Sequence, residues 1–202
     1  MLLQVDPAYK AHLPSLPSKA GLHAVAPSTL ATTNRLQQHR VGAIRRLAQR
    51  LQLVLEQAAG LEQEVASLAA AQYQPLTQLH GVGLFTAGAL AGILGPGRRF
   101  RSEAQLAAYA GVAPLEASSA GHVRHRLNRG GNRRLNAILY RIALSQIRSL
   151  PEARAYLARR QAEGKTWREA IRALKRYLIR AIWRLWQQCL KTSGGEGMLQ
   201  AA

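Results

Sequence analysis

The stretch that decides the fold is residues 44–68, IRRLAQRLQLVLEQAAGLEQEVASL. Its apolar positions recur at alternating spacings of three and four residues, which places them along one side of an α-helix. These positions are Ile44, Leu47, Leu51, Val54, Ala58, Leu61, Val65 and Leu68. The spacing is the heptad pattern of a coiled coil, formed between chains or within a helical hairpin, although a long helix on its own domain's core gives the same stripe. Gly60 lowers helix propensity by about 1 kcal/mol, so the helix can kink or break there.

The segments that follow also carry helix signals. Ser102 and Gln105 have the spacing of a capping box, and that helix is expected to end near Gly111. Asn132 is a candidate N-cap for a helix that runs to about Ser149 and ends at Pro151. A short helix over 151–162 and a last helix over about 166–190 complete the pattern. No stretch alternates with a period of two, so the sequence predicts an all-α fold.

We therefore expect four parts along the chain. They are a loose, proline-punctuated leader (1–28), a coiled-coil helical segment (29–74), a compact helical domain (75–191) and a flexible, glycine-rich tail (192–202). The compact domain contains one turn of helix-hairpin-helix type.

The charge of the chain points to a polyanionic partner. The 202 residues include 28 Lys and Arg against 10 Asp and Glu, which gives a formal net charge of +18. Such an excess opposes compaction unless a polyanion binds, and nucleic acid is the first candidate, with an anionic membrane surface the second. The single cysteine, Cys189, excludes an internal disulfide and suits a reducing cytoplasm. The apolar run near residues 81–95 is too short for a membrane span. A membrane-surface helix is disfavoured because Trp183 and Trp186 fall at packed positions of the last helix, so no membrane association is expected.

Two glycine-containing motifs are candidate phosphate contacts. Gly81 and Gly83, in LHGVG (79–83), match the turn of a helix-hairpin-helix, in which backbone N–H groups at a helix N-terminus bind phosphate. The alternative is a plain turn between two packed helices. A second candidate is a cationic loop and helix start made of Arg124, Arg126, Arg129, Arg133 and Arg134. Cations in the first turn of a helix oppose its macrodipole, so we expect an anion there, although a solvated basic loop remains the alternative.

The basic stripe of the last helix is interpreted as a solvent face with non-specific phosphate contacts only. It consists of Arg168, Arg172, Lys175, Arg176, Arg180 and Arg184. No metal site is expected, because the chain has one aspartate, Asp6, and its glutamates are spread along the sequence.

Ser118 and Ser119 stand beside the cationic loop. A serine becomes a nucleophile only with a base or a field that favours the alkoxide, which Arg124 and Arg126 could supply while also stabilising a pentavalent phosphorane. The alternative is a polar turn.

The order of three runs in this chain resembles the C-terminal domain of the one-ten and one-sixteen group of insertion-sequence transposases. The runs are LHGVGLFTAGALAGILG (79–95), RRFRSEAQLAAYAGVAPLEASSAG (98–121) and NRGGNRRLNAILYRIAL (128–144), and the resemblance covers about 76–190. It implies DNA transposition and recombination through a serine nucleophile on an all-α domain. The family serine follows the proline of "AP" by five residues, which selects Ser119 over Ser118, although Ala120 stands where relatives often have glycine.

The resemblance also implies partners and a missing part. Full-length relatives carry an upstream acidic domain that holds Mg²⁺, are guided by a structured bridge RNA, and assemble partly through the coiled coil. Because this chain has no acidic quartet, we expect a truncated transposase that binds no cofactor by itself and is inactive alone. A bacterial cytoplasmic location at the nucleoid follows from the same resemblance. The alternative function is a non-catalytic helix-hairpin-helix module that binds nucleic acid or regulates a complete transposase.

Overall fold

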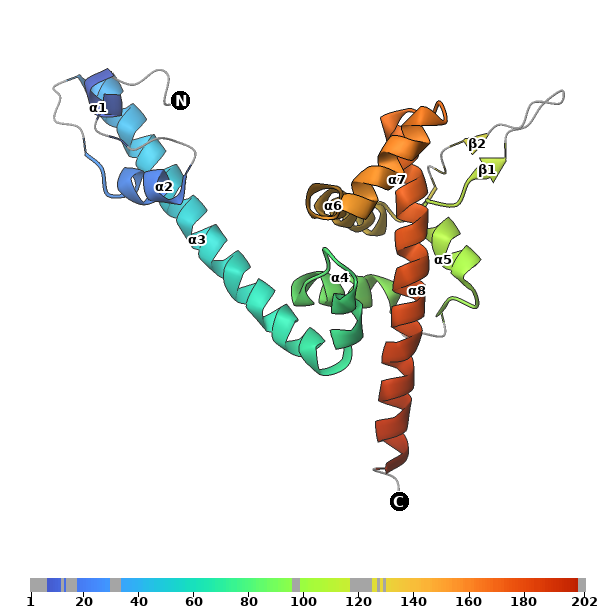
Figure 1. Cartoon of the computed structure of the whole chain (residues 1–202). Coiled ribbons are helices and arrows are strands. Elements are labelled where there is room, and N and C mark those ends of the chain that lie inside the picture. Colours follow the sequence, from blue (N-terminus) through green and yellow to red (C-terminus); the bar gives the residue numbers. More distant parts are fainter. Residues whose placement is uncertain are drawn as a thin grey trace. The chain divides into compact units, whose positions relative to one another are not determined.

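Figure 1 shows the computed structural model of the chain, which describes residues 7–11, 13, 18–29, 34–95, 99–116, 125, 126, 128 and 130–199. The chain divides into two compact units, Met1–Glu62 and Gln63–Ala202. The long helix α3, Arg35–Gln72, begins in the first unit and ends in the second. Among the described residues, no helix combines the length and the apolar character needed to cross a membrane.

The first unit is a small helical cluster. It contains α1 (Pro7–Ala11), α2 (Lys19–Val25) and the first part of α3. Their apolar side chains form a core of Tyr9, Val25, Ala26, Val41, Ile44 and Ala48. The predicted loose leader therefore differs from the structure. Ser18 starts α2 by accepting a hydrogen bond from the Gly21 N–H, and burial of Val25 against α3 stabilises a helix too short to show a period in sequence.

Helix α3 runs through Gly60 without a break. Two positions of its heptad stripe pack within the chain: Ile44 is buried in the first unit, and Val65 lies where a side chain on Gly88 of α4 would collide with it. The last position, Leu68, is 76% exposed. The middle of the stripe is exposed, as Leu61 (61%) illustrates. The helix is confirmed, and the coiled coil stays a prediction.

Among the described residues of the second unit, five helices and a 3₁₀ turn follow α3 and pack around one core. After α3 come η2 (Gln74–Gln78), α4 (Leu84–Leu94), α5 (Glu103–Tyr109), α6 (Arg133–Ser149), α7 (Pro151–Ala162) and α8 (Trp167–Leu199). Helix α8 contacts η2, α5, α6 and α7 and is the central element. Its fully buried residues include Ile179, Ile182 and Trp186, and the Trp186 ring stacks on Tyr73 at 5.4 Å between centroids.

The predicted helix starts of this unit are confirmed. Ser102 accepts from the Gln105 N–H at 3.3 Å, while Gln105 accepts in return from the Arg101 N–H at 2.9 Å. Asn132 accepts from the Leu135 N–H at 2.9 Å and caps α6. Helix α8 continues to Leu199, past the predicted end near 190, although Gly194, Gly195 and Gly197 each lower helix propensity there.

One short β-ladder interrupts this all-α fold. Strand β1 (Leu115–Glu116) pairs antiparallel with β2 (His125–Arg126), in the register Leu115 with Arg126 and Glu116 with His125. Strands of two residues are too short to produce a readable alternation, which is why the sequence did not predict them.

Candidate nucleic-acid interface

The glycine turn before α4 is fixed against α6. Gly81 has a φ of 88°, in the left-handed region, and a Cβ there would lie 3.1 Å from Ser145 Cβ. Gln146 donates from Nε2 to the His80 carbonyl at 2.9 Å and so holds the turn in place. Gly83 is the N-cap of α4 and supplies no side chain to its first N–H groups. The turn thus has the open helix N-terminus that phosphate binding requires, and its role in binding stays a prediction.

The segment after β2 is anchored on the end of α5. The Asn132 N–H donates to the Tyr109 carbonyl at 2.6 Å, and Asn132 Nδ2 donates to the Tyr109 hydroxyl at 2.7 Å. Gly131 crosses Gly111 so closely that a Cβ on Gly131 would collide with the Gly111 backbone. Asn128 adds a hydrogen bond from Nδ2 to the Ala108 carbonyl at 3.2 Å. The chain entering β1 and the chain leaving β2 are therefore held together at their base.

Most of the predicted loop residues lie outside the part of the chain that the structure describes. Ser118, Ser119, Arg124 and Arg129 lie outside the described residues, and the structure assigns them no position. Arg126 belongs to β2, where its backbone pairs with Leu115. Residues 117–124 join β1 to β2 along the chain, so the segment that contains both serines begins and ends at paired strands.

Arg133 and Arg134 form the exposed first turn of α6, and that turn contains no acidic residue. Arg133 also lines a pocket of about 420 Å³ together with Gly131, Asn136 and Lys175. The structure therefore brings one of the predicted cations to the base of the β1–β2 pair.

Lys175 lies in the same pocket and differs from its predicted position on a solvent face. Its side chain is 6% exposed, and Nζ donates to Asn136 Oδ1 at 2.8 Å. Burial, with a smaller contribution from Arg172, lowers the pKa of this ammonium. The last helix presents Lys175 toward α6 because Ile171, Leu174 and Leu178 bury the adjoining side of the same helix.

A second pocket, also of about 420 Å³, lies between the 111–114 loop, α7 and α8. Its cationic lining residues are Arg160, Lys165, Arg172, Arg176 and Arg180, and its aromatic ones are Tyr156 and Tyr177. The sequence interpretation missed this site because helical spacing shows that Arg172, Arg176 and Arg180 share a side of α8 but not that α7 closes over them. The tyrosines spaced among arginines were the available signal.

The described carboxylates do not fit a Mg²⁺ site. Glu103 pairs with Arg180 at 2.9 Å, and Glu163 pairs with Arg160 at 2.7 Å. Glu169 accepts from Thr166 and lies 3.7 Å from Arg172. In the described part of the chain, no group of three or more His, Cys, Asp or Glu residues could hold a metal ion. Each of these carboxylates instead neutralises or caps a neighbouring element.

Comparison with known proteins finds relatives of the region that contains these candidate sites. Residues 73–158 match the model of the transposase IS116/IS110/IS902 family. The chain is 38% identical over 136 residues to an uncharacterized 43.6 kDa protein of insertion element IS110 from Streptomyces coelicolor, an alignment that covers 66% of this chain and 34% of the relative. It is 37% identical over 86 residues to an uncharacterized 42 kDa protein of insertion element IS900 from Mycobacterium paratuberculosis, covering 42% of this chain and 21% of that relative. The helical region 73–158 of this chain thus matches the IS116/IS110/IS902 family of transposases.

Proposed function

We propose that this chain binds insertion-sequence DNA and carries the serine nucleophile of a transposase. The observation that supports this most directly is the β1–β2 pair inside the family-matched region, with cations gathered at its base. The alignments span 34% and 21% of the two relatives, so the activity of the whole protein is part of this proposal.

Ser119 is the proposed nucleophile, with Ser118 as second choice. Its Oγ attacks the phosphorus of a DNA phosphodiester and forms a phosphoserine ester. One ester oxygen of the DNA leaves as a strand-end hydroxyl and takes up the proton that the serine loses. Arg124 and Arg126, on the same connection and strand, stabilise the negative charge that develops on the phosphorane oxygens.

DNA is positioned by backbone and cationic contacts around this segment. The open N-terminus of α4 at Gly83 and the Arg133–Arg134 turn of α6 each offer a phosphate contact. Arg129 belongs to the same proposed set. These contacts carry no sequence information, so a structured guide RNA, as the family resemblance implies, is the proposed source of target choice.

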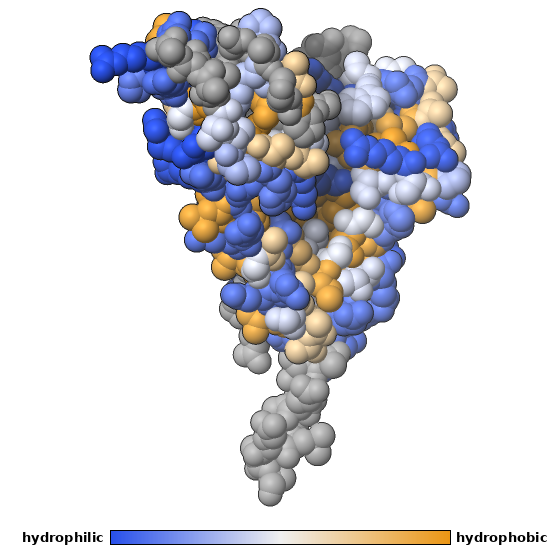
Figure 2. Space-filling view, turned by 90° about the vertical axis from the view of Figure 1, so that its left-hand side faces the viewer, coloured by the Kyte–Doolittle hydropathy of each residue, from blue (hydrophilic) through white to orange (hydrophobic). Residues whose placement is uncertain are grey.

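Self-association through α3 completes the proposal. The exposed middle of its heptad stripe includes Leu47, Leu51, Val54 and Leu61. On the face shown in Figure 2, hydrophobic residues lie exposed among hydrophilic ones. A second copy of α3 would bury this stripe in a homo-oligomer.

One observation favours a second candidate function. The described carboxylates do not fit a magnesium site, so no step of the reaction is assigned to a metal held by them. A non-catalytic module that binds nucleic acid and regulates a complete transposase through mixed oligomers is therefore the alternative.

The two functions are separated by a complementation assay. A full-length relative whose own nucleophilic serine is replaced is mixed with this chain, Mg²⁺ and DNA containing the insertion-sequence ends. Covalent protein–DNA product is then resolved on a denaturing gel. We expect product with the wild type and with Ser118→Ala and none with Ser119→Ala. Absence of product with all three, while DNA binding persists, would favour the regulatory module.

A further inference from the structure

The pocket between α7, α8 and the 111–114 loop has the chemistry of a nucleotide site. We call it the tyrosine–arginine pocket, lined by Tyr156, Arg160, Arg172, Arg176, Tyr177 and Arg180. Its volume of about 420 Å³ lies within the range of roughly 300–1,000 Å³ that small-ligand sites occupy.

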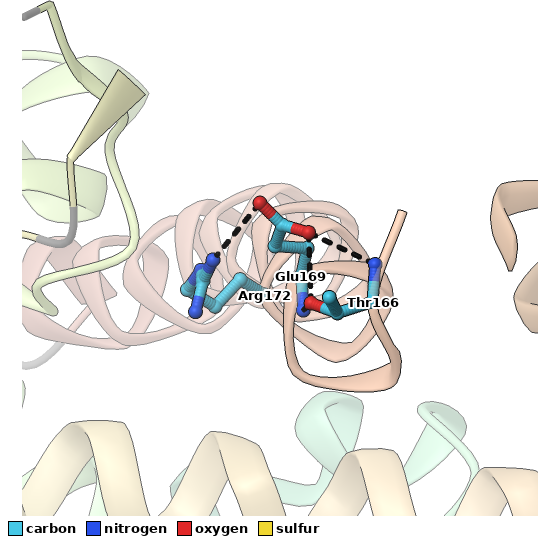
Figure 3. Close-up of polar contacts among 3 residues, drawn as sticks. All are labelled: Thr166, Glu169 and Arg172. Carbon is cyan, nitrogen blue, oxygen red and sulfur yellow. Dashed lines mark hydrogen bonds and ion pairs between the residues drawn. The ribbon is translucent and has the colours of Figure 1, made fainter. Parts of the chain in front are cut away.

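The positive charge of the tyrosine–arginine pocket is only partly neutralised. Among the described lining residues, the single carboxylate is Glu169, which is held by Thr166. Its Oε2 accepts from the Thr166 N–H at 2.9 Å and from the Thr166 hydroxyl at 2.7 Å, as Figure 3 shows. Its other oxygen lies 3.7 Å from Arg172. No described carboxylate forms an ion pair with Arg176 or with Lys165 at the pocket edge. The pocket therefore keeps an excess of positive charge, which suits a phosphate group.

The same pocket offers aromatic surface. The rings of Tyr156 and Tyr177 meet edge to face, with centroids 5.4 Å apart and an interplanar angle of 80°. Arg160 donates from Nε to the Tyr156 hydroxyl at 3.2 Å, which fixes the first ring. Tyr177 has the Arg180 guanidinium 5.9 Å from its ring centroid and is 52% exposed, so part of its surface is accessible to a planar group. Stacking of a base on an exposed aromatic ring beside a phosphate-binding cation is the usual way in which proteins bind single-stranded nucleic acid.

The pocket also adjoins the base of the β1–β2 pair. Its wall, residues 111–114, leads directly into β1 at Leu115. Asn128, which follows β2, lies in the lining as well. A nucleotide held in the pocket would therefore lie beside the base of the β1–β2 pair.

From these observations we infer that the tyrosine–arginine pocket binds one unpaired nucleotide of a DNA or RNA strand, with its phosphate on Arg176 and Arg172 and its base stacked on Tyr177. A duplex cannot occupy the pocket in this way, because its bases are stacked on one another. This inference rests on the proposed binding of nucleic acid but is independent of the serine chemistry.

The test compares strands with and without bases. Affinities of the whole chain are measured by fluorescence anisotropy for an oligothymidylate, an oligouridylate, a fully abasic strand of equal length and a DNA duplex. We expect the wild type to bind the thymidylate strand roughly 5- to 100-fold more tightly than the abasic one. Tyr177→Ala removes that preference, while Tyr177→Phe keeps it. The uridylate arm shows whether the pocket distinguishes RNA from DNA.

Charge and stacking are separated by a second variant. Arg176→Gln weakens binding of thymidylate and abasic strands by the same factor and lowers the salt slope by about one, because it removes a phosphate contact. Tyr140→Ala, at an exposed tyrosine of α6 outside the pocket, is the matched control and leaves the base preference unchanged. Circular dichroism melts show whether each variant is folded. As a measurement independent of the variants, a 5-iodouracil strand is expected to crosslink to the peptides that contain Tyr156 or Tyr177.

Three results would overturn the inference. If Tyr177→Ala is folded and keeps the full preference for thymidylate over the abasic strand, the base does not stack in this pocket. If the wild type binds duplex but not single strands, the inferred role of the pocket is wrong, while the proposed DNA binding stands. If the wild type binds none of these nucleic acids, the inference and the proposed function fail together.

Discussion

Lys175 on α8 donates from Nζ to Oδ1 of Asn136 on α6 at 2.8 Å, and the lysine is almost fully buried. Asn136 donates in turn from Nδ2 to the Ala110 carbonyl at 2.8 Å. One amide therefore joins α6 to the end of α5 and to α8, below the β1–β2 pair. Because an amide accepts a hydrogen bond without supplying a charge, it offsets only part of the cost of burying the ammonium.

This arrangement predicts how stability depends on pH. Below the lowered folded-state pKa of Lys175, both folded and unfolded chains carry the charge, and the burial penalty is complete. Between that pKa and the ordinary lysine value, the unfolded chain binds more protons, so stability rises with pH. Lys175→Met should remove this rise, measured as urea unfolding at pH values from about 7 to about 10. Lys191→Met, at an exposed position of α8, should retain it. Parallel curves for the wild type and Lys175→Met would contradict the prediction.

The crossing of Gly131 and Gly111 predicts that alanine substitutions at the neighbouring Gly130 and Gly131 differ sharply in their effect on stability. Gly131→Ala places a methyl group against the Gly111 backbone and should destabilise the protein by about 1–3 kcal/mol. Gly130→Ala places its methyl 3.5 Å from Asn128 Oδ1, an ordinary contact, and should have a much smaller effect. Thermal melts of the two variants test this. Equal losses of stability in the two variants would show that the two backbones cross less closely than described.

The exposed cations at the start of α6 predict a salt effect on DNA binding. Replacement of both Arg133 and Arg134 by Gln should lower the slope of log affinity against log salt by up to about 1.8, since each phosphate contact contributes about 0.9. Titrations of duplex DNA at several salt concentrations measure the slope. Arg50→Gln, an exposed arginine of α3, is the control. If the control lowers the slope as much per charge, binding is spread over the whole basic surface.

The exposed heptad stripe predicts a change in oligomeric state. Val54→Glu combined with Leu61→Glu places like charges on the proposed helix–helix seam and should shift the chain to a smaller assembly, as measured by analytical ultracentrifugation. Helix content should not change, because both positions are exposed. Gln57→Glu combined with Gln63→Glu adds the same charge at other exposed positions of α3 and should leave the assembly intact. A wild-type monomer at all concentrations would rule out the seam.

Local sequence signals predicted much of the fold because they depend on near neighbours. The Ser102–Gln105 capping box and the Asn132 cap each involve residues three apart, and both formed as expected. The helices of the first unit were missed because they are short and depend on burial against α3, which sequence spacing does not reveal.

The candidate site was harder to predict, since its parts come together only through packing. Arg133 and Lys175 are 42 positions apart in sequence and line one pocket, and Tyr156 meets Tyr177 across two helices. A count of basic residues on the last helix could not distinguish the buried Lys175 from its more exposed neighbours. The sequence shows which basic residues lie on one side of the helix, but not that α6 packs against Lys175. Ser118 and Ser119 remain candidates from sequence alone.

The continuity of α8 limits how this region can change during evolution. The capping glutamate, the buried lysine and the pocket residues Arg176 and Tyr177 follow one another on a single uninterrupted helix. Each inserted residue turns everything downstream by about 100°. One extra residue between Glu169 and Lys175 would therefore rotate the guanidinium groups into the hydrophobic interior and the interior leucines into water. Point substitutions can change individual side chains of this helix. The number of residues between Glu169 and Lys175, in contrast, must stay constant to keep the downstream side chains on their present faces.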